Sequence, residues 1–263
     1  TRPKELRLLV RLDPQDDGPY NNDYHYHLQG LVYSLIRSGG RADVHDRHGY
    51  KFFCFSNIFP YRARFARGVE QELLISSPDP EMVSSISRAL HARMEGKSPL
   101  QVGEAKFSIS GMEGPFHAKM PIDSVVKVVS STPIIIRIPA WRYTDYGIVS
   151  KRPFENWRDN LPLEAFVKQL RDNMEKKFKE YSGLNVGGQP TVDPQFPEIV
   201  SYRYLKSVSK PITVKGERQQ VVGSIWEIEF AVENEEATSM LQFALDSGFG
   251  ERNSLGFGFM NPI

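Results

Sequence analysis

Apolar and polar positions alternate along residues 5–110 with a period that switches between two and about 3.6. A period of two predicts a half-buried strand, and the longer period predicts an amphipathic helix. Gly39-Gly40 ends the first helical pattern, and Asp79-Pro80 is typical of the cap and first position of another helix. The expected elements are a strand at 5–13, a helix at 23–37, a strand at 51–59, a strand pair within 64–76, a helix at 79–93 and a strand at 106–110.

The second half of the chain repeats this plan. The expected elements are a strand at 133–138, a helix at 163–181, strands within 199–207 and 222–230, a helix at 235–246 and a strand at 256–260. Asn234 is the expected cap of the last helix, and Gly248 follows its end. Two copies of a β-α-β-β-α-β unit predict an α+β fold of two tandem ferredoxin-like, or RRM-like, domains. Such folds host many functions, so the fold does not settle the activity.

The expected domains are 1–120 and 121–263, with the seam between Pro115 and Lys127. A chain of 263 residues suits two modest cores, and 40% hydrophobic with 25% charged residues is ordinary globular composition. Cys54 is the only cysteine, which excludes an intrachain disulfide and favours a reducing cytoplasm. No apolar stretch approaches membrane-spanning length, and the first residues lack a signal-peptide core, so neither a membrane partner nor export is expected.

Net charge alone does not indicate a nucleic-acid partner, because 33 Lys and Arg against 32 Asp and Glu give +1. A local excess of cations occurs in one strand-rich stretch, in which Glu217 is the only acid. Its cations are Arg203, Lys206, Lys210, Lys215 and Arg218. A basic strip of this kind can bind a phosphate backbone. It can equally be a solvated hairpin whose cations protect an exposed edge.

A glycine-rich segment, residues 248–259, follows the last expected helix. Glycine reaches positive φ and allows close approach of another backbone, and consecutive N–H groups in such a turn can form an anion-binding nest. Phosphate is therefore a candidate ligand, although a hairpin can also need glycine at tight positions. The candidate RNA-binding residues here are Gly248, Gly250, Arg252, Asn253, Ser254, Gly256 and Gly258.

This segment resembles the C-terminal glycine-rich motif of the RAMP superfamily of CRISPR proteins. The segments Tyr20-Asn21, Tyr26–Tyr33 and Val44–Phe53 are similar to the first helix and second strand of archaeal CRISPR repeat-RNA endoribonucleases. The resemblance implies a metal-independent, cofactor-free endoribonuclease of antiviral defence whose partner is CRISPR repeat RNA. It also implies that Tyr33, His45 and Lys51 form the catalytic group, carried by the first domain.

The three residues also have ordinary interpretations. Tyr33 lies off the apolar stripe of its expected helix, so the core does not require its hydroxyl, but a boundary tyrosine often lies there. His45 and His48 lie in a glycine-bounded loop, where histidines are usually solvated. Lys51 opens a strand, where a lysine commonly extends to water.

Cleavage of RNA by its own 2′-hydroxyl needs a base, an acid and positive charge on the phosphate. The expected products are a 2′,3′-cyclic phosphate and a 5′-hydroxyl. Histidine can be acid or base near neutral pH, whereas tyrosine is a base only if cations such as Lys51 depress its pKa. The resemblance makes tyrosine the base and histidine the acid. Chemistry alone equally allows His45 and His48 to be the pair, so the roles of Tyr33 and His48 stay open.

The sequence also allows a metal site and functions other than RNA cleavage. Asp43, His45, Asp46 and His48 can instead be metal ligands, but further ligands are not evident, so no metal site is predicted. The alternative function is a non-catalytic RAMP-type subunit that holds RNA in a CRISPR effector complex, and a third is a scaffold unrelated to RNA. Retention of the three catalytic candidates favours the enzyme. Effector-complex subunits and a second copy of the chain, as a homodimer, are further partners that the sequence allows.

Overall fold

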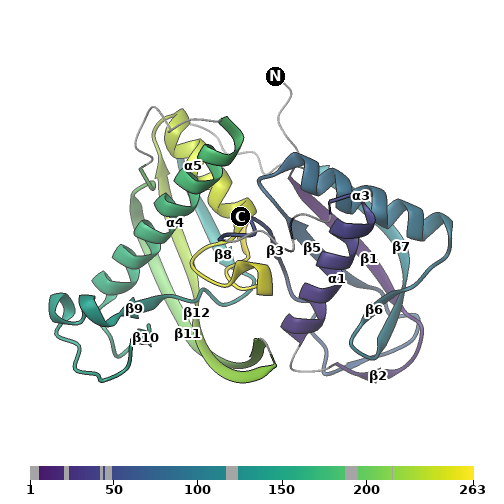
Figure 1. The fold of residues 1–263 in the computed structure, drawn as a ribbon, viewed down its shortest axis with the longest axis horizontal. Helices are drawn as coiled ribbons and strands as arrows, with labels where there is room; N and C mark the ends of the chain where they lie inside the picture. The colour runs from purple at the N-terminus through teal and green to yellow at the C-terminus, as the bar shows by residue number, and fades with distance from the viewer. Residues whose placement is uncertain are drawn as a thin grey trace. The chain divides into compact units, whose positions relative to one another are not determined.

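The computed structural model describes residues 6–20, 24–41, 44, 49–116, 124–186, 195–214 and 216–263. The chain divides into two compact units (Figure 1). Unit 1 comprises residues 1–117, 211–218 and 254–256, and unit 2 comprises 118–210, 219–253 and 257–263. The expected boundary between residues 120 and 121 lies in 117–123, outside the described residues, so it stays a prediction.

Unit 1 is built on a five-stranded antiparallel sheet with the strand order β3-β5-β1-β7-β6. The first strand lies between the last and the third, which is the arrangement of a ferredoxin-like unit, and β6 extends the edge beside β7. Its elements are β1 (Arg7–Pro14), β2 (Gly18–Pro19), α1 (Tyr24–Ser38), β3 (Cys54–Phe55), β4 (Arg64–Phe65), β5 (Gln71–Ser76), α3 (Pro80–Glu95), β6 (Leu100–Val102) and β7 (Ala105–Phe116).

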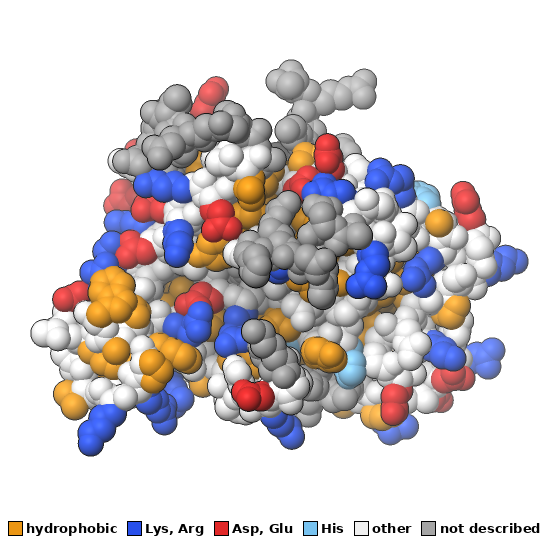
Figure 2. Space-filling model, viewed as in Figure 1, with side chains coloured by type: hydrophobic (Ala, Val, Ile, Leu, Met, Phe, Trp, Pro, Cys, Tyr) orange, Lys and Arg blue, Asp and Glu red, His pale blue; other side chains and the backbone are white. Residues whose placement is uncertain are grey.

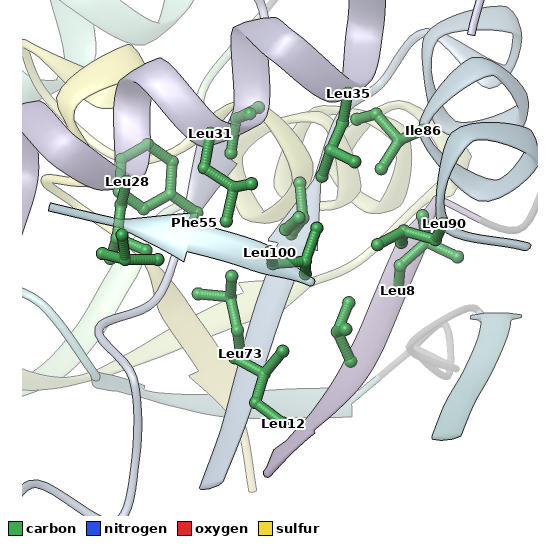
Figure 3. Close-up of a cluster of buried hydrophobic side chains, with 14 of the residues drawn as sticks. Leu8, Leu12, Leu28, Leu31, Leu35, Phe55, Leu73, Ile86, Leu90 and Leu100 are labelled. Atoms are coloured by element: carbon green, nitrogen blue, oxygen red, sulfur yellow. The ribbon is translucent and has the colours of Figure 1, made fainter. Parts of the chain in front are cut away.

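One apolar cluster joins α1 and α3 to the sheet of unit 1. Figure 3 shows Leu31 and Leu35 of α1 in the same cluster as Ile86 and Leu90 of α3, with Leu8 of β1 beneath them. These side chains recur at helical spacing on the buried faces, so burial of this stripe sets which face of α1 remains exposed.

The remaining elements lie in unit 2, except that some of them also include residues of the short segments 211–218 and 254–256 of unit 1. They are β8 (Ser124–Ser130), β9 (Arg137–Pro139), η1 (Ala140–Arg142), η2 (Thr144–Tyr146), β10 (Phe154–Asn156), α4 (Leu163–Val186), β11 (Ile199–Val214), β12 (Glu217–Val232), α5 (Glu235–Ser247), η3 (Asn253–Leu255) and β13 (Met260–Pro262). The four-stranded sheet has the order β11-β12-β8-β13, so the first strand again lies between the last and the third. The predicted α+β fold of two tandem ferredoxin-like domains is confirmed.

The four long helices confirm the predicted ones, with ends that differ by a few residues. Asp79 accepts hydrogen bonds from the backbone of Glu81 and Met82, and Asn234 caps α5 by accepting from Ala237 N–H. None of the helices in the described part of the chain combines the length and the hydrophobicity that a membrane crossing requires.

The strand predicted at 133–138 is wrong, because β8 at Ser124–Ser130 takes the first place in the second sheet. Alternate residues of β8 are buried, as a ladder strand requires. In the run 133–138, Ile134, Ile135 and Ile136 are all buried, yet only isolated bridges form before β9. Continuous apolar character there indicated burial rather than strand pairing.

Three other strand predictions need correction. β3 covers only Cys54–Phe55 of the predicted 51–59. The segments within 64–76 do not pair with each other, since β4 pairs with β2 while β5 pairs with β1 and β3. The last strand begins at Met260 rather than 256, because Gly256 and Gly258 have positive φ and interrupt an extended backbone.

Candidate active site

Tyr33 lies on the exposed side of α1 with its ring half-buried. The ring packs edge-on against Phe53, with 5.3 Å between centroids and 87° between planes. A side-chain hydrogen bond joins Tyr33 to Ser254, and Gln29 Nε2 lies 3.5 Å from Ser254 Oγ. The tip of the glycine-rich segment therefore meets α1 at the predicted catalytic tyrosine, and all these residues belong to unit 1.

The next two residues of the tip, Leu255 and Gly256, also contact other residues of unit 1. His25 Nδ1 lies 2.7 Å from the carbonyl oxygen of Leu255, and His25 is fully buried. Because a carbonyl only accepts, this hydrogen bond requires the proton to be on Nδ1. A Cβ on Gly256 would lie 2.4 Å from the buried ring of Phe55. Each of the three residues 254–256 is thus held by a contact with a different side chain. We call this segment the loop tip.

Burial raises the pKa of the Tyr33 hydroxyl above its ordinary value of 10.0, and the hydrogen bond with Ser254 lowers it in part. Burial also raises the pKa of Tyr20 and of Tyr24, which lie deeper. At neutral pH Tyr33 is therefore protonated, and its hydroxyl can donate a hydrogen bond to an anionic oxygen.

Lys51 is half-buried, and its Nζ lies 3.5 Å from the carbonyl oxygen of Val44. The following residue, Phe52, is buried and has a φ of 53°, a left-handed conformation that costs a bulky residue about 1–3 kcal/mol. The Ser77 hydroxyl donates to the Phe52 carbonyl at 2.6 Å, which helps to hold this turn. Strain is thus stored directly beside the predicted catalytic lysine.

The predicted catalytic His45 lies outside the described residues, and so do Asp43, Asp46 and His48 of the metal interpretation. The metal interpretation therefore stays untested at these four positions. Within the ranges that the structure does describe, no three His, Cys, Asp or Glu side chains form a group that could hold a metal ion.

Most of the glycine-rich segment is buried, and protein atoms explain its glycines. Gly248, Gly250, Gly256 and Gly258 have φ between 67° and 87°, as the sequence predicts. A Cβ on Gly250 would lie 2.5 Å from the Ile135 carbonyl oxygen, and one on Gly258 would lie 1.9 Å from that of Phe249. Packing thus accounts for these two glycines.

The backbone N–H groups of Gly248 and Gly258 donate to the carbonyls of Ala244 and Pro133. These two donors are therefore not directed at a phosphate, which weakens the nest interpretation at both positions. Of the predicted RNA-binding residues in this segment, Arg252 and Ser254 reach the surface, whereas Asn253 is buried.

Lys177 on α4 holds the part of the glycine-rich segment that belongs to unit 2, and the sequence interpretation missed it. It is only 1% exposed, and its ammonium donates to the carbonyls of Gly248 and Gly250 at 2.5 and 3.1 Å and to Asn253 Oδ1 at 2.9 Å. The Asn253 amide in turn donates to the carbonyls of Phe249 and Phe257. Lys177 and Asn253 together brace the glycine-rich segment from inside unit 2.

A signal for the burial of Lys177 was present in the sequence. Lys177 follows Leu170 and Met174 at seven and three residues, so it lies on the apolar stripe of α4. Both of those residues are fully buried. A lysine on a buried stripe needs hydrogen-bond acceptors to compensate its loss of hydration.

The structure places the cations of the predicted basic strip on both faces of β11. Arg203 forms an ion pair with Glu227, which raises the pKa of Arg203, and Lys127 lies 3.0 Å from the same carboxylate. Lys206 is exposed, and the alternation of β11 places it on the opposite face from Arg203. Lys210 follows on β11 as a half-buried residue, and Lys215 lies outside the described residues. Figure 2 shows Lys and Arg interspersed with Asp and Glu over the visible face.

Comparison with known proteins supports the architecture. A solved structure described as "An RAMP protein binding different RNA substrates" superposes with a TM-score of 0.67 at 20% identity, covering 98% of this chain and 99% of that chain. The chain thus has the fold of a RAMP protein, two tandem ferredoxin-like domains.

The family described as "CRISPR associated protein Cas6, C-terminal" matches residues 122–262, which is more than half of the chain. "CRISPR-associated endoribonuclease Cas6 2" of Methanocaldococcus jannaschii is 29% identical over 98% of this chain and 100% of its own length. "CRISPR-associated endoribonuclease Cas6" of Haloferax mediterranei is 28% identical over 98% and 94%. The chain belongs to the Cas6 family of CRISPR-associated proteins. The expected membership in a family of CRISPR-associated proteins is confirmed.

Replacing Lys177 by methionine tests the brace. The change removes the donor from two backbone carbonyls and from Asn253 Oδ1, so we expect the free energy of unfolding to fall by about 2–4 kcal/mol. Asn253→Ala is expected to act on the same network, so the two changes together should cost about 1 kcal/mol less than their sum. Urea denaturation of the two single variants and the double variant measures both quantities.

Lys176→Met is the matched control, because Lys176 is the exposed neighbour on the same helix. It should change the stability by less than about 0.5 kcal/mol. Equal stabilities of Lys176→Met and Lys177→Met would contradict the brace.

Proposed function

We propose that this chain is an endoribonuclease that binds CRISPR repeat RNA and cuts precursor RNA by attack of the RNA's own 2′-hydroxyl, without a metal ion. The observation that carries the proposal is the meeting of the Tyr33 hydroxyl with Ser254 of the loop tip. Family membership and the names of the two relatives, both endoribonucleases, support it.

In the proposed reaction a base takes the proton of the 2′-hydroxyl, and the 2′-oxygen forms a bond to phosphorus. The bond from phosphorus to the 5′-oxygen breaks, and an acid protonates that oxygen. No water is consumed, so one product ends in a 2′,3′-cyclic phosphate and the other begins with a 5′-hydroxyl. The transition state gains negative charge on the phosphate, which a cation or a hydrogen-bond donor stabilises.

We assign this chemistry to Tyr33, His45 and Lys51. Lys51 supplies the positive charge. The raised pKa of Tyr33 favours its protonated form, which donates a hydrogen bond to the phosphate rather than accepting the 2′-proton. Proton transfer then rests on the imidazoles, either with His45 and His48 as the acid and base, or with His45 alone taking the 2′-proton and returning it to the 5′-oxygen.

RNA binding is assigned to the surface residues of the predicted set, and most directly to Arg252 and Ser254. Lys206, Lys210 and Lys215 are assigned contacts to the phosphate backbone. The buried glycines and Asn253 shape the loop rather than touch RNA. Assembly with effector-complex subunits and homodimer formation stay predictions of the sequence.

His45→Ala tests the assignment of the imidazole. We expect cutting of a labelled repeat transcript to slow by about 10²–10⁴-fold while RNA affinity stays near that of the wild type. Gel analysis in buffer with EDTA measures cutting, and the wild-type chain should cut there. His91→Ala is the matched control, since His91 is an exposed histidine on α3. Wild-type inhibition by EDTA, or full activity of His45→Ala, contradicts the proposal.

Tyr33→Phe tests the protonation state of the tyrosine. The variant keeps the ring that packs on Phe53 but loses the hydroxyl, so we expect the rate to fall about 10²–10³-fold, as for other lost donors to the transition state. Because the pKa of Tyr33 lies above its ordinary value, the shape of the pH–rate profile between about pH 6 and pH 9 should not change. If the pH–rate profile of the wild type shows an ionisation in that range and the profile of Tyr33→Phe lacks it, Tyr33 ionises and acts as the base.

A further inference from the structure

A groove of about 1300 Å³ runs along the exposed face of α1, within unit 1. Tyr26, Gly30, Tyr33 and Arg37 line it at intervals of four, three and four residues, so they form one stripe of the helix opposite its buried stripe. Tyr26 is 51% exposed. The groove therefore connects an exposed aromatic ring with the predicted catalytic tyrosine.

The opposite wall of the groove comes from the turn between β6 and β7, together with Arg93 and Arg218. Gly103 in this turn lies against His27, because a Cβ there would be 3.2 Å from the imidazole. Among the described residues that line the groove, Glu104 is the one carboxylate, and the arginines are Arg37, Arg93 and Arg218.

None of these three arginines pairs with a carboxylate among the described residues. Other arginines of the chain are compensated: Arg11 pairs with Glu113, and Arg203 with Glu227. The lining thus has an excess of uncompensated positive charge, which suits an anionic ligand.

No contact with the described protein atoms accounts for a glycine, rather than a larger residue, at position 30 of the groove. It lies in the interior of α1, where glycine is less favourable than alanine in a helix. A Cβ on Gly30 would have no atom within 4 Å, in contrast to Gly250 and Gly258, which packing requires. Gly183 is another helical glycine with an open Cβ position, but it lies three residues before the end of α4. The space above Gly30 is therefore available to a ligand.

We propose that this groove holds about two or three single-stranded nucleotides of the RNA next to the phosphate that is cut, and the proposal rests on the proposed function. The RNA backbone passes over Gly30, a base stacks on Tyr26 and the arginines contact phosphates. Seven residues of helix separate Tyr26 from Tyr33, roughly 10 Å along the axis. That length matches about three stacked nucleotides, which are spaced by roughly 3.4 Å.

Gly30→Glu tests the groove, because it places a bulky anion in the groove without a clash at its Cβ. We expect the dissociation constant for repeat RNA to rise about tenfold or more, through loss of space and repulsion of phosphate. Affinity is measured with an RNA that carries a 2′-deoxy nucleotide at the cut position. Gly183→Glu should bind within about twofold of the wild type, because it places the same charge on a residue that does not line the groove. Gly30→Ala should weaken binding less than Gly30→Glu, because it adds only a methyl group and no charge.

Thermal melting separates a binding defect from a folding defect. Alanine and glutamate both form helix better than glycine, so both Gly30 variants should melt at or above the wild-type temperature. Wild-type affinity in Gly30→Glu overturns the proposal, as does an equal loss of affinity in Gly183→Glu. If the wild-type chain binds RNA without cutting it, and Gly30→Glu weakens binding while Gly183→Glu does not, the groove is supported and the proposed cleavage fails. If the wild-type chain cuts RNA and Gly30→Glu cuts and binds equally well, the groove alone fails.

Discussion

Ser254, Leu255 and Gly256 each contact a different side chain of unit 1, and the candidate active site exists only where these contacts hold together. The hydrogen bond of Leu255 to buried His25 is the constraint on which the other two depend, because it fixes the backbone in the middle of the loop tip. With Leu255 held, Ser254 meets the hydroxyl of Tyr33, and Gly256 leaves room for the ring of Phe55. A short loop segment thus lies against α1 beside Tyr33.

Within unit 2, the glycine-rich segment before the loop tip is ordered by a buried charge. The ammonium of Lys177 has backbone carbonyls and Asn253 as acceptors, and these bonds compensate the charge for its loss of water. Glycines at Gly250 and Gly258 allow the close approach of the backbone that the brace needs. We therefore interpret the glycines as determinants of the loop's shape, and the surface groups Arg252 and Ser254 as its contribution to ligand binding.

Sequence patterns predicted the features that depend on interactions between residues close together in the chain. Caps such as Asp79 and Asn234, and apolar residues at helical spacing, marked the four long helices because both act within a few residues of the backbone that they stabilise. The strand at Ser124–Ser130 was missed, since the stronger apolar run that follows is buried without forming a ladder. Tyr33 and Lys51 were predicted through a family resemblance. Lys177 was not found, because its acceptors lie 71 or more residues away. Gly30 lies within a segment that carries the family resemblance, but the sequence assigned it no role, and the open space around its Cβ position became visible only in the structure.

We propose that RNA is cut at the helix face around Tyr33, with the 2′-hydroxyl of the RNA as the nucleophile. The most direct measurement removes that hydroxyl from the substrate. A repeat RNA with a single 2′-deoxy nucleotide at the cut position, incubated with the wild-type chain in EDTA, should bind as tightly as the unmodified RNA and remain intact at that position. Cutting of the deoxy RNA at the same position and rate would contradict the account, because it would require water or another nucleophile to attack the phosphate.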